Sequence, residues 1–289
     1  MDATWSLDAF MENSATVRNL LKQAAEQLRP APTAARDAEL LLLHTLKKDR
    51  VWLLMHPDAG ISAEAQAAFF EKIARRAKLE PIQYITGEQE FYGFTFRVTP
   101  ATLIPRPETE HLVEAALEHG SRDSSARILD IGTGSGAIAI VLAHLLPQAE
   151  VTAVDLSPAA LAIAQENAAR YGVEQRIRFL ESDLLTAVAG EQFDMIVSNP
   201  PYVPSTDILE PQVRDYEPAS ALYAGEDGLD IYRRLIPQAH AALKPGGWLL
   251  MEIGYGQREV LTTLLSGWEE IGFVDDLQGI PRVAMARRG

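Results

Sequence analysis

The sequence contains no cysteine and no long uninterrupted apolar run. The first absence excludes disulfide bonds, thiolate–metal sites and cysteine nucleophiles, and it is compatible with a reducing compartment. The second argues against a helix that crosses a bilayer, which needs about 20 apolar residues. The first residues also lack the basic and apolar regions of a signal peptide. We therefore expect a cytoplasmic protein with no membrane partner.

Basic residues are scarce, because 26 Lys+Arg face 40 Asp+Glu and the formal net charge is −14. Most of the acidic excess lies after residue 90. A protein that grips duplex nucleic acid usually concentrates basic charge. The balance therefore argues against a direct nucleic-acid partner, although a local basic patch can override net charge. The 6 histidines show no metal-ligand spacing, and we predict no metal.

Two regions with different residue patterns follow each other along the 289 residues. Between about Ser14 and Lys78, apolar residues recur at helical spacing, Pro30 interrupts them, and Thr33 and Ser62 are candidate N-caps. Several short helices with brief connections predict a small bundle. From Tyr84 to Val98, aromatic and β-branched residues with glycines at turn positions are typical of a β-hairpin.

After residue 127, predicted strands alternate with predicted helices. The expected strands are 128–131, 151–154, 177–180, 193–197 and 248–253, with closing strands at 273–274 and 283–286. Repeated β–α units predict a mostly parallel, seven-stranded Rossmann-like sheet covered by helices on both faces. The predicted domains are a helical bundle over 1–82, a β-hairpin linker over 83–105 and an α/β domain over 106–289. The first ~12 residues are expected to form a disordered extension.

A glycine-rich loop stands where the first predicted strand gives way to a helix. Its residues are Gly132, Thr133, Gly134, Ser135 and Gly136. Glycines here let the backbone pass close beneath a ligand. About 20 residues further on, Asp155 ends the next strand, where a carboxylate can accept hydrogen bonds from both ribose hydroxyls of an adenosine. With Ala137 in the last place, the loop also fits the dinucleotide form G-x-G-x-x-A.

Two acidic residues favour S-adenosylmethionine over a dinucleotide. Asp130 lies two residues before Gly132, and we expect it at the mouth of the loop. A carboxylate there suits an ammonium and a sulfonium better than a pyrophosphate. Asp183 follows the third strand, and we expect it to accept from the adenine amino group, with Leu184 against the ring. Taken alone, Asp183 can also be interpreted as a helix cap.

The tetrapeptide Asn199-Pro200-Pro201-Tyr202 follows the fourth strand, at the same edge of the sheet as the glycine loop. The two prolines fix the backbone, so that the Pro200 carbonyl and the Asn199 side-chain oxygen can accept from one substrate NH₂ group. Tyr202 offers a flat face to a planar amide or base. Two fixed acceptors turn a delocalised nitrogen lone pair toward a methyl donor. No strong general base is required, because the proton can leave after methyl transfer.

Three further segments are distinctive: EPIQYITG at residues 80–87, EFYG at 90–93 and LIPRPETE at 103–110. With these segments, the chain closely resembles the release-factor glutamine N5-methyltransferase family (PrmC/HemK). The Asn-Pro-Pro-Tyr motif alone is shared with nucleic-acid amino-methyltransferases that act on adenine N6 or cytosine N4. The additional segments select the protein-methylating family.

The resemblance implies a class I methyltransferase that acts on the glutamine of the Gly-Gly-Gln motif in class 1 peptide chain release factors. It implies that S-adenosylmethionine is held by Gly132, Thr133, Gly134, Ser135, Gly136, Asp155, Asp183, Leu184 and Asn199. It also implies that Asn199, Pro200 and Tyr202 are catalytic and, with Pro201, bind the glutamine amide. Some family members have an aromatic residue where Leu184 stands, so aliphatic packing is expected to replace stacking here.

Three other functions are weighed against this one. A nucleic-acid amino-methyltransferase shares the chemistry, and the acidic catalytic region argues against it. A nicotinamide-dependent dehydrogenase shares the glycine loop but leaves residues 199–202 unexplained. A non-catalytic helical adaptor has no use for an acceptor pair beside a cofactor loop.

Overall fold

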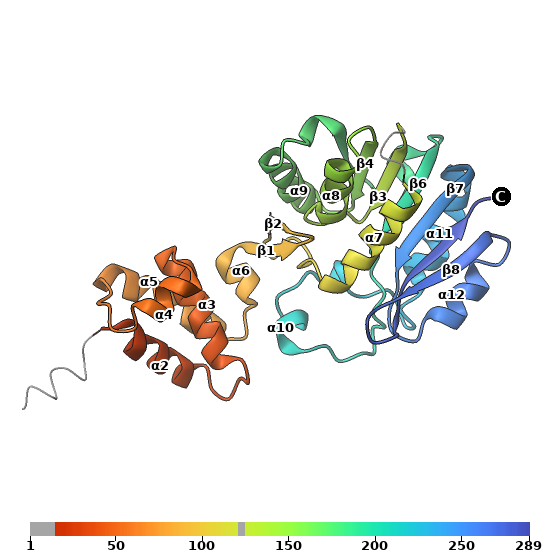
Figure 1. Cartoon of the computed structure of the whole chain (residues 1–289). Helices are drawn as coiled ribbons and strands as arrows, with labels where there is room; N and C mark the ends of the chain where they lie inside the picture. Colours follow the sequence, from red (N-terminus) through yellow and green to blue (C-terminus); the bar gives the residue numbers. More distant parts are fainter. Residues whose placement is uncertain (1–14, 121–124) are drawn as a thin grey trace, which may run out of the picture. The chain divides into compact units, whose positions relative to one another are not determined.

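The computed structural model describes residues 15–120 and 125–289. The expected N-terminal extension therefore lies outside the described residues. The chain divides into two compact units, Met1–Thr86 and Gly87–Gly289 (Figure 1). Each unit has buried hydrophobic clusters made of its own residues. No helix within the described ranges is long and apolar enough to cross a membrane.

The first unit is a bundle of short helices, as the sequence predicts. The helices are α2 (Val17–Gln27), α3 (Ala34–Leu46), α4 (Arg50–Met55), α5 (Ala63–Arg76) and α6 (Ile82–Thr86). Ser62 caps α5 by accepting from the Ala65 N–H at 3.3 Å. Thr33 does not cap α3, because its hydroxyl donates to Asp37 at 3.0 Å instead. The apolar faces of these helices meet around Phe69, which is fully buried.

The β-hairpin is shorter than the sequence suggests. Its strands are β1 (Glu88–Phe91) and β2 (Phe94–Arg97), paired antiparallel. The expected start at Tyr84 is wrong, because the Pro81 carbonyl accepts two backbone N–H groups and makes a helical turn that ends at Gly87, whose φ is 79°. Within the second unit, the side chain of Asn167 bonds the backbone N–H and C=O of Arg97 at 2.8 and 3.0 Å. These bonds attach the hairpin to the rest of the second unit.

The second unit contains a seven-stranded, mostly parallel sheet, which confirms the predicted fold. Its strands are β3 (Arg127–Ile131), β4 (Glu150–Asp155), β5 (Ile177–Glu181), β6 (Phe193–Ser198), β7 (Leu243–Glu252), β8 (Glu269–Asp275) and β9 (Pro281–Arg287). Their order is β5-β4-β3-β6-β7-β9-β8, and only the pairs that involve β9 are antiparallel. The chain runs outward from β3 on one side and from β6 on the other. The carboxyl ends of β3 and β6 therefore form the switch point where ligands bind in such sheets.

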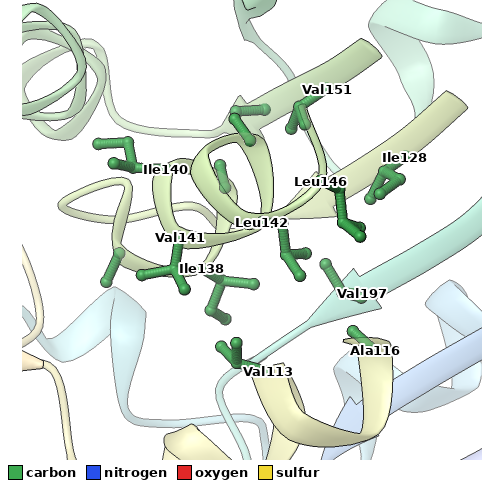
Figure 2. Close-up of a cluster of buried hydrophobic side chains, with 14 of the residues drawn as sticks. Val113, Ala116, Ile128, Ile138, Ile140, Val141, Leu142, Leu146, Val151 and Val197 are labelled. Carbon is green, nitrogen blue, oxygen red and sulfur yellow. The ribbon is translucent and has the colours of Figure 1, made fainter. Parts of the chain in front are cut away.

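Helices cover both faces of this sheet. They are η1 (Pro107–Thr109), α7 (Glu110–His119), α8 (Ala137–Leu145), α9 (Pro158–Arg170), η2 (Glu174–Arg176), η3 (Thr186–Val188), α10 (Pro211–Arg214), η4 (Ala219–Ala221), α11 (Asp230–Ala242) and α12 (Arg258–Leu264). Neighbouring residues of a strand face opposite layers, so Ile128 joins the cluster under α7 and α8 while Leu129 joins the one under α11. Figure 2 shows the first cluster, with Val113, Leu142 and Val197 between helices and sheet.

Candidate active site

A cavity of about 480 Å³ opens at the carboxyl ends of β3, β4 and β6. One side is lined by residues 132–135, the end of β4 and residues 182–184. The other side is lined by residues 198–201, by parts of 101–109 and by parts of 218–221. The predicted cofactor loop and the Asn-Pro-Pro segment therefore share one cavity at the switch point of the sheet.

The glycine loop follows β3 and enters α8 with three left-handed residues. Gly132, Gly134 and Gly136 have φ of 74°, 57° and 82°, a conformation that favours glycine. A Cβ on Gly132 would meet only the Asn199 carbonyl oxygen, at 3.8 Å, so the backbone faces open space there. Gly136 does not line the cavity. A Cβ on Gly136 would lie 2.9 Å from Ile140 Cδ1, so this glycine lets α8 pack.

Asp155 ends β4 and lies against the glycine loop. Its two carboxylate oxygens accept from the backbone N–H groups of Gly134 at 2.8 Å and Ser157 at 2.9 Å. Burial raises the pKa of Asp155 above its ordinary value, and these hydrogen bonds lower it. A carboxylate has about four lone-pair sites, so Asp155 can accept from further donors in the cavity that it lines.

Asp130 is not at the mouth of the loop, and that expectation is wrong. Residues 129 and 131 of β3 face the α11 layer, so Asp130 points to the opposite layer and is fully buried. Its Oδ2 accepts from the Thr133 hydroxyl at 2.6 Å. Its Oδ1 has no hydrogen-bond partner within the described part of the chain, and burial raises the pKa of Asp130 to about 7. Asp130 holds the loop from behind and does not line the cavity.

Asp183 and Leu184 line the cavity beyond β5. Asp183 is an ion-pair partner of Arg234 at 2.6 Å, and both side chains are about half exposed. Its side chain caps no helix, because Leu185 holds the N-cap position of η3. Leu184 has a φ of 51°. Arg234 binds Oδ2 of Asp183, which leaves Oδ1 as a further acceptor on a residue that lines the cavity.

The tetrapeptide after β6 is split between the cavity and the core. Asn199, Pro200 and Pro201 line the cavity, and Asn199 Nδ2 donates to Thr109 Oγ1 at 3.1 Å. Tyr202 lies outside the cavity lining and packs against the α11 cluster. Its hydroxyl donates to Glu252 at 3.2 Å, and burial raises its pKa well above the ordinary value. The sequence-based role of Tyr202 as a flat face for the substrate stays a prediction.

Two residues of this site were missed by the sequence analysis as functional groups. Thr109 is 4% exposed at the end of η1, and Glu252 is 2% exposed at the end of β7. The Thr109 hydroxyl donates to Glu252 Oε2 at 2.5 Å. Burial raises the pKa of Glu252 to about 6, while the hydrogen bonds from Thr109 and Tyr202 lower it. An acidic residue at the end of an apolar strand, at the same sheet edge as Asn199, is the signal that could have revealed it.

Another buried carboxylate, that of Glu217, ties together two segments that line the cavity. The Glu217 side chain is 1% exposed, and it accepts from the Ile104 N–H at 3.1 Å and from Arg106 Nη2 at 2.5 Å. The segment from 101 to 109 is thereby tied to the segment from 218 to 221, and both line the cavity. Among the described residues, no group of three or more potential ligands is arranged to hold a metal ion.

Both units of this chain are similar in sequence to known protein families. The family model of the PrmC N-terminal domain matches residues 19–87, and the family model of the methyltransferase small domain matches residues 109–212. A release factor glutamine methyltransferase of Koribacter versatilis is 50% identical, over 94% of this chain and 99% of its own. One of Geobacter sulfurreducens is 45% identical, over 95% and 97%.

Solved structures support the fold. The hMettl16 catalytic domain, in complex with a 3′UTR hairpin, matches with a TM-score of 0.57 and 14% identity, covering 90% of this chain and 92% of its own. A T. thermophilus 16S rRNA methyltransferase in complex with AdoMet and guanosine has a TM-score of 0.54 and 21% identity, over 70% and 50%. These two likenesses show the fold alone. The near-full-length relatives at 45–50% identity confirm the predicted methyltransferase and show that the chain belongs to the release factor glutamine methyltransferase family.

Proposed function

We propose that this enzyme transfers a methyl group from S-adenosylmethionine to the side-chain amide nitrogen, N5, of the glutamine in the Gly-Gly-Gln motif of class 1 peptide chain release factors. The observation that carries the proposal is the position of Asn199. Its side-chain nitrogen is bound to Thr109 at 3.1 Å, which leaves its oxygen as the acceptor in a cavity shared with the glycine loop. The names of the relatives favour a protein amide over a nucleobase.

The residues on the β4 side of the cavity fit an adenosine-containing cofactor. Gly132 leaves open space above its backbone, and Asp155 retains lone pairs for ribose hydroxyls. Asp183 and Leu184 line the same cavity, and we expect them to contact the adenine. Thr133 and Ser135 complete the loop and line the cavity. When bound, S-adenosylmethionine supplies a methyl group on a positively charged sulfur. We predict no metal contribution to this chemistry.

The residues on the β6 side act on the substrate amide. The Asn199 side-chain oxygen and the Pro200 carbonyl accept hydrogen bonds from the two N–H groups of the glutamine NH₂ group, while Pro201 holds the backbone of this turn. Because both acceptors lie in the plane of the substrate amide, the nitrogen lone pair is directed out of that plane. The acceptors also stabilise the positive charge that develops on the nitrogen during methyl transfer. The apolar lining, which includes Leu103, Pro105 and Pro218, excludes water around the reacting group.

The helical unit is proposed to recognise the release factor. All residues that line the cavity lie between 101 and 231, so the first unit contributes none of them. Its own hydrophobic cluster gives it an independent core. A separate unit without cavity residues suits partner recognition.

Labelled S-adenosylmethionine tests the proposed reaction. We expect label in a purified class 1 release factor and none in a release factor whose Gly-Gly-Gln glutamine is replaced by glutamate, because glutamate has no NH₂ group. Equal labelling of both proteins would show that another residue is methylated.

Asp155→Ala is expected to weaken S-adenosylmethionine binding by about 1.5–3 kcal/mol, roughly 10- to 150-fold in Kd, because the ribose loses a charged acceptor. Calorimetry measures the change. An analogue without the ribose 2′-hydroxyl separates this contact from the bond that Asp155 makes to Gly134. The native protein should lose affinity for the analogue, whereas the variant should discriminate much less. Equal discrimination by both proteins would contradict the assignment.

A further inference from the structure

A buried chain of hydrogen bonds runs behind the substrate side of the cavity. Asn199 Nδ2 donates to Thr109 Oγ1 at 3.1 Å, the Thr109 hydroxyl donates to Glu252 Oε2 at 2.5 Å, and the Tyr202 hydroxyl donates to Glu252 Oε1 at 3.2 Å. The chain joins three elements that are distant in sequence: the end of η1, the turn after β6 and the end of β7. The proposed reaction uses only Asn199 directly, so the function of the other members needs an explanation.

The donors and acceptors in this chain permit only one arrangement while Glu252 is ionised. A carboxylate only accepts hydrogen bonds, and a hydroxyl carries a single proton. The Thr109 hydroxyl must therefore donate its one hydrogen bond to Glu252, and the Thr109 oxygen can then only accept a hydrogen bond from Asn199. The amide of Asn199 meets that requirement solely through its NH₂ group. Its oxygen is forced to the other side, into the cavity.

The placement of Glu252 follows from the sheet. Leu250 of β7 faces the layer under α7, and Glu252, two residues later, faces the same layer. Thr109 stands at the start of α7 on that layer. The Tyr232 hydroxyl donates to the Glu252 carbonyl at 2.7 Å, which fixes the strand end from the α11 side. Tyr232 therefore bonds only the backbone of residue 252, whereas the carboxylate accepts its hydrogen bonds from Thr109 and Tyr202.

From this geometry we infer that Thr109 and Glu252 are positioning residues, which lock the Asn199 amide with its oxygen toward the substrate NH₂ group. The inference rests on the proposed function, because it concerns the acceptor that holds the amide. Without the lock, a half-turn of the Asn199 amide would place an NH₂ group against the substrate NH₂ group. Two donors facing each other would abolish the acceptor pair.

The charges around Glu252 determine whether its carboxyl is ionised, and the proposed orientation of the Asn199 amide requires the ionised form. Arg282 on β9 favours the ionised carboxylate, and Glu108 on η1 opposes it. Tyr202 and Tyr232 face it as neutral hydroxyls, since burial keeps the pKa of both above the ordinary value. Burial raises the pKa of the Glu252 carboxyl to about 6. Below that pH the protonated Glu252 carboxyl can donate a hydrogen bond to the Thr109 oxygen. The Thr109 hydroxyl is then free to donate a hydrogen bond to the side-chain oxygen of Asn199.

Thr109→Val and Thr109→Ser form the test pair, because valine keeps the shape and removes the hydroxyl whereas serine keeps the hydroxyl. We expect Thr109→Val to lower kcat for a release factor on the order of 10²-fold, the cost of a misplaced catalytic group, with little change in S-adenosylmethionine affinity. Thr109→Ser should stay close to native. Tyr232→Phe is the matched control, since it also removes a buried hydrogen bond to residue 252 but leaves the Asn199–Thr109–Glu252 chain intact.

The pH profile is a second measurement that needs no variant. The kcat of the native enzyme should fall as the pH drops through about 6, and that acid limb should be absent in Thr109→Val. The inference is overturned if Thr109→Val turns over as fast as the unmodified enzyme, or if Thr109→Ser or Tyr232→Phe loses as much kcat as Thr109→Val. It is also overturned if the kcat of the unmodified enzyme does not change as the pH drops through this range. A native enzyme that labels no release factor would instead refute the proposed function.

Discussion

Asn199→Ala is expected to lower kcat by about 10²–10³-fold, the loss typical of one preorganised hydrogen-bonding group in an active site. The substitution removes the acceptor for one substrate N–H and leaves the glycine loop and Asp155 in place. The contact strengthens as positive charge develops on the nitrogen, so the loss falls on kcat more than on cofactor affinity. Steady-state turnover of a release factor at saturating S-adenosylmethionine, together with calorimetry of cofactor binding, measures both effects.

Asn199→Asp is the discriminating control for that prediction. Aspartate keeps an oxygen toward the substrate but loses the N–H that Asn199 donates to Thr109, and it adds a negative charge near the buried Glu252. We expect turnover in the order native, then Asp, then Ala. Near-native turnover in both variants would mean that Asn199 is only a turn residue, and the proposed mechanism would have to be abandoned.

Removal of the helical unit is expected to abolish methylation of intact release factor while cofactor affinity stays the same. The cut falls between Thr86 and Gly87, where the two units meet in sequence, so the truncated protein keeps the hairpin and every residue that lines the cavity. The hydrophobic clusters of the catalytic unit contain no residue before Phe91, so this unit retains its whole core.

S-adenosylmethionine binding by the truncated protein is the control for its folding. Native affinity with no transfer to release factor would support the recognition role of the helical unit. Transfer at the native rate by the truncated enzyme would assign that unit some other purpose.

Much of the catalytic fold could be predicted because its signals are local. Buried parallel strands appear as continuous apolar runs such as 128–131, and glycines at 132, 134 and 136 mark a turn that only small residues permit. The strand ends then bring the loop and the tetrapeptide to one edge of the sheet. The hairpin start at Tyr84 was mispredicted because a proline at 81 favoured a helical turn over the strand preference of the following residues.

The arrangement of buried polar groups could not be predicted in this way. Asp130 was expected beside the ligand, but the alternation of side chains along β3 turns it into the core. The contact between Thr109 and Glu252 joins residues 143 positions apart, and no short-range sequence pattern predicts such a contact. Its existence depends on how α7 packs on β7.

The measurement that tests the central claim most directly is site mapping by mass spectrometry. The enzyme is incubated with S-adenosylmethionine and an equimolar mixture of a class 1 release factor and duplex DNA, and both products are fragmented. The account predicts a single added methyl group on the side-chain amide nitrogen of the Gly-Gly-Gln glutamine, with unmodified DNA. A methyl group on an adenine or cytosine amino nitrogen, with an unmodified release factor, would contradict it.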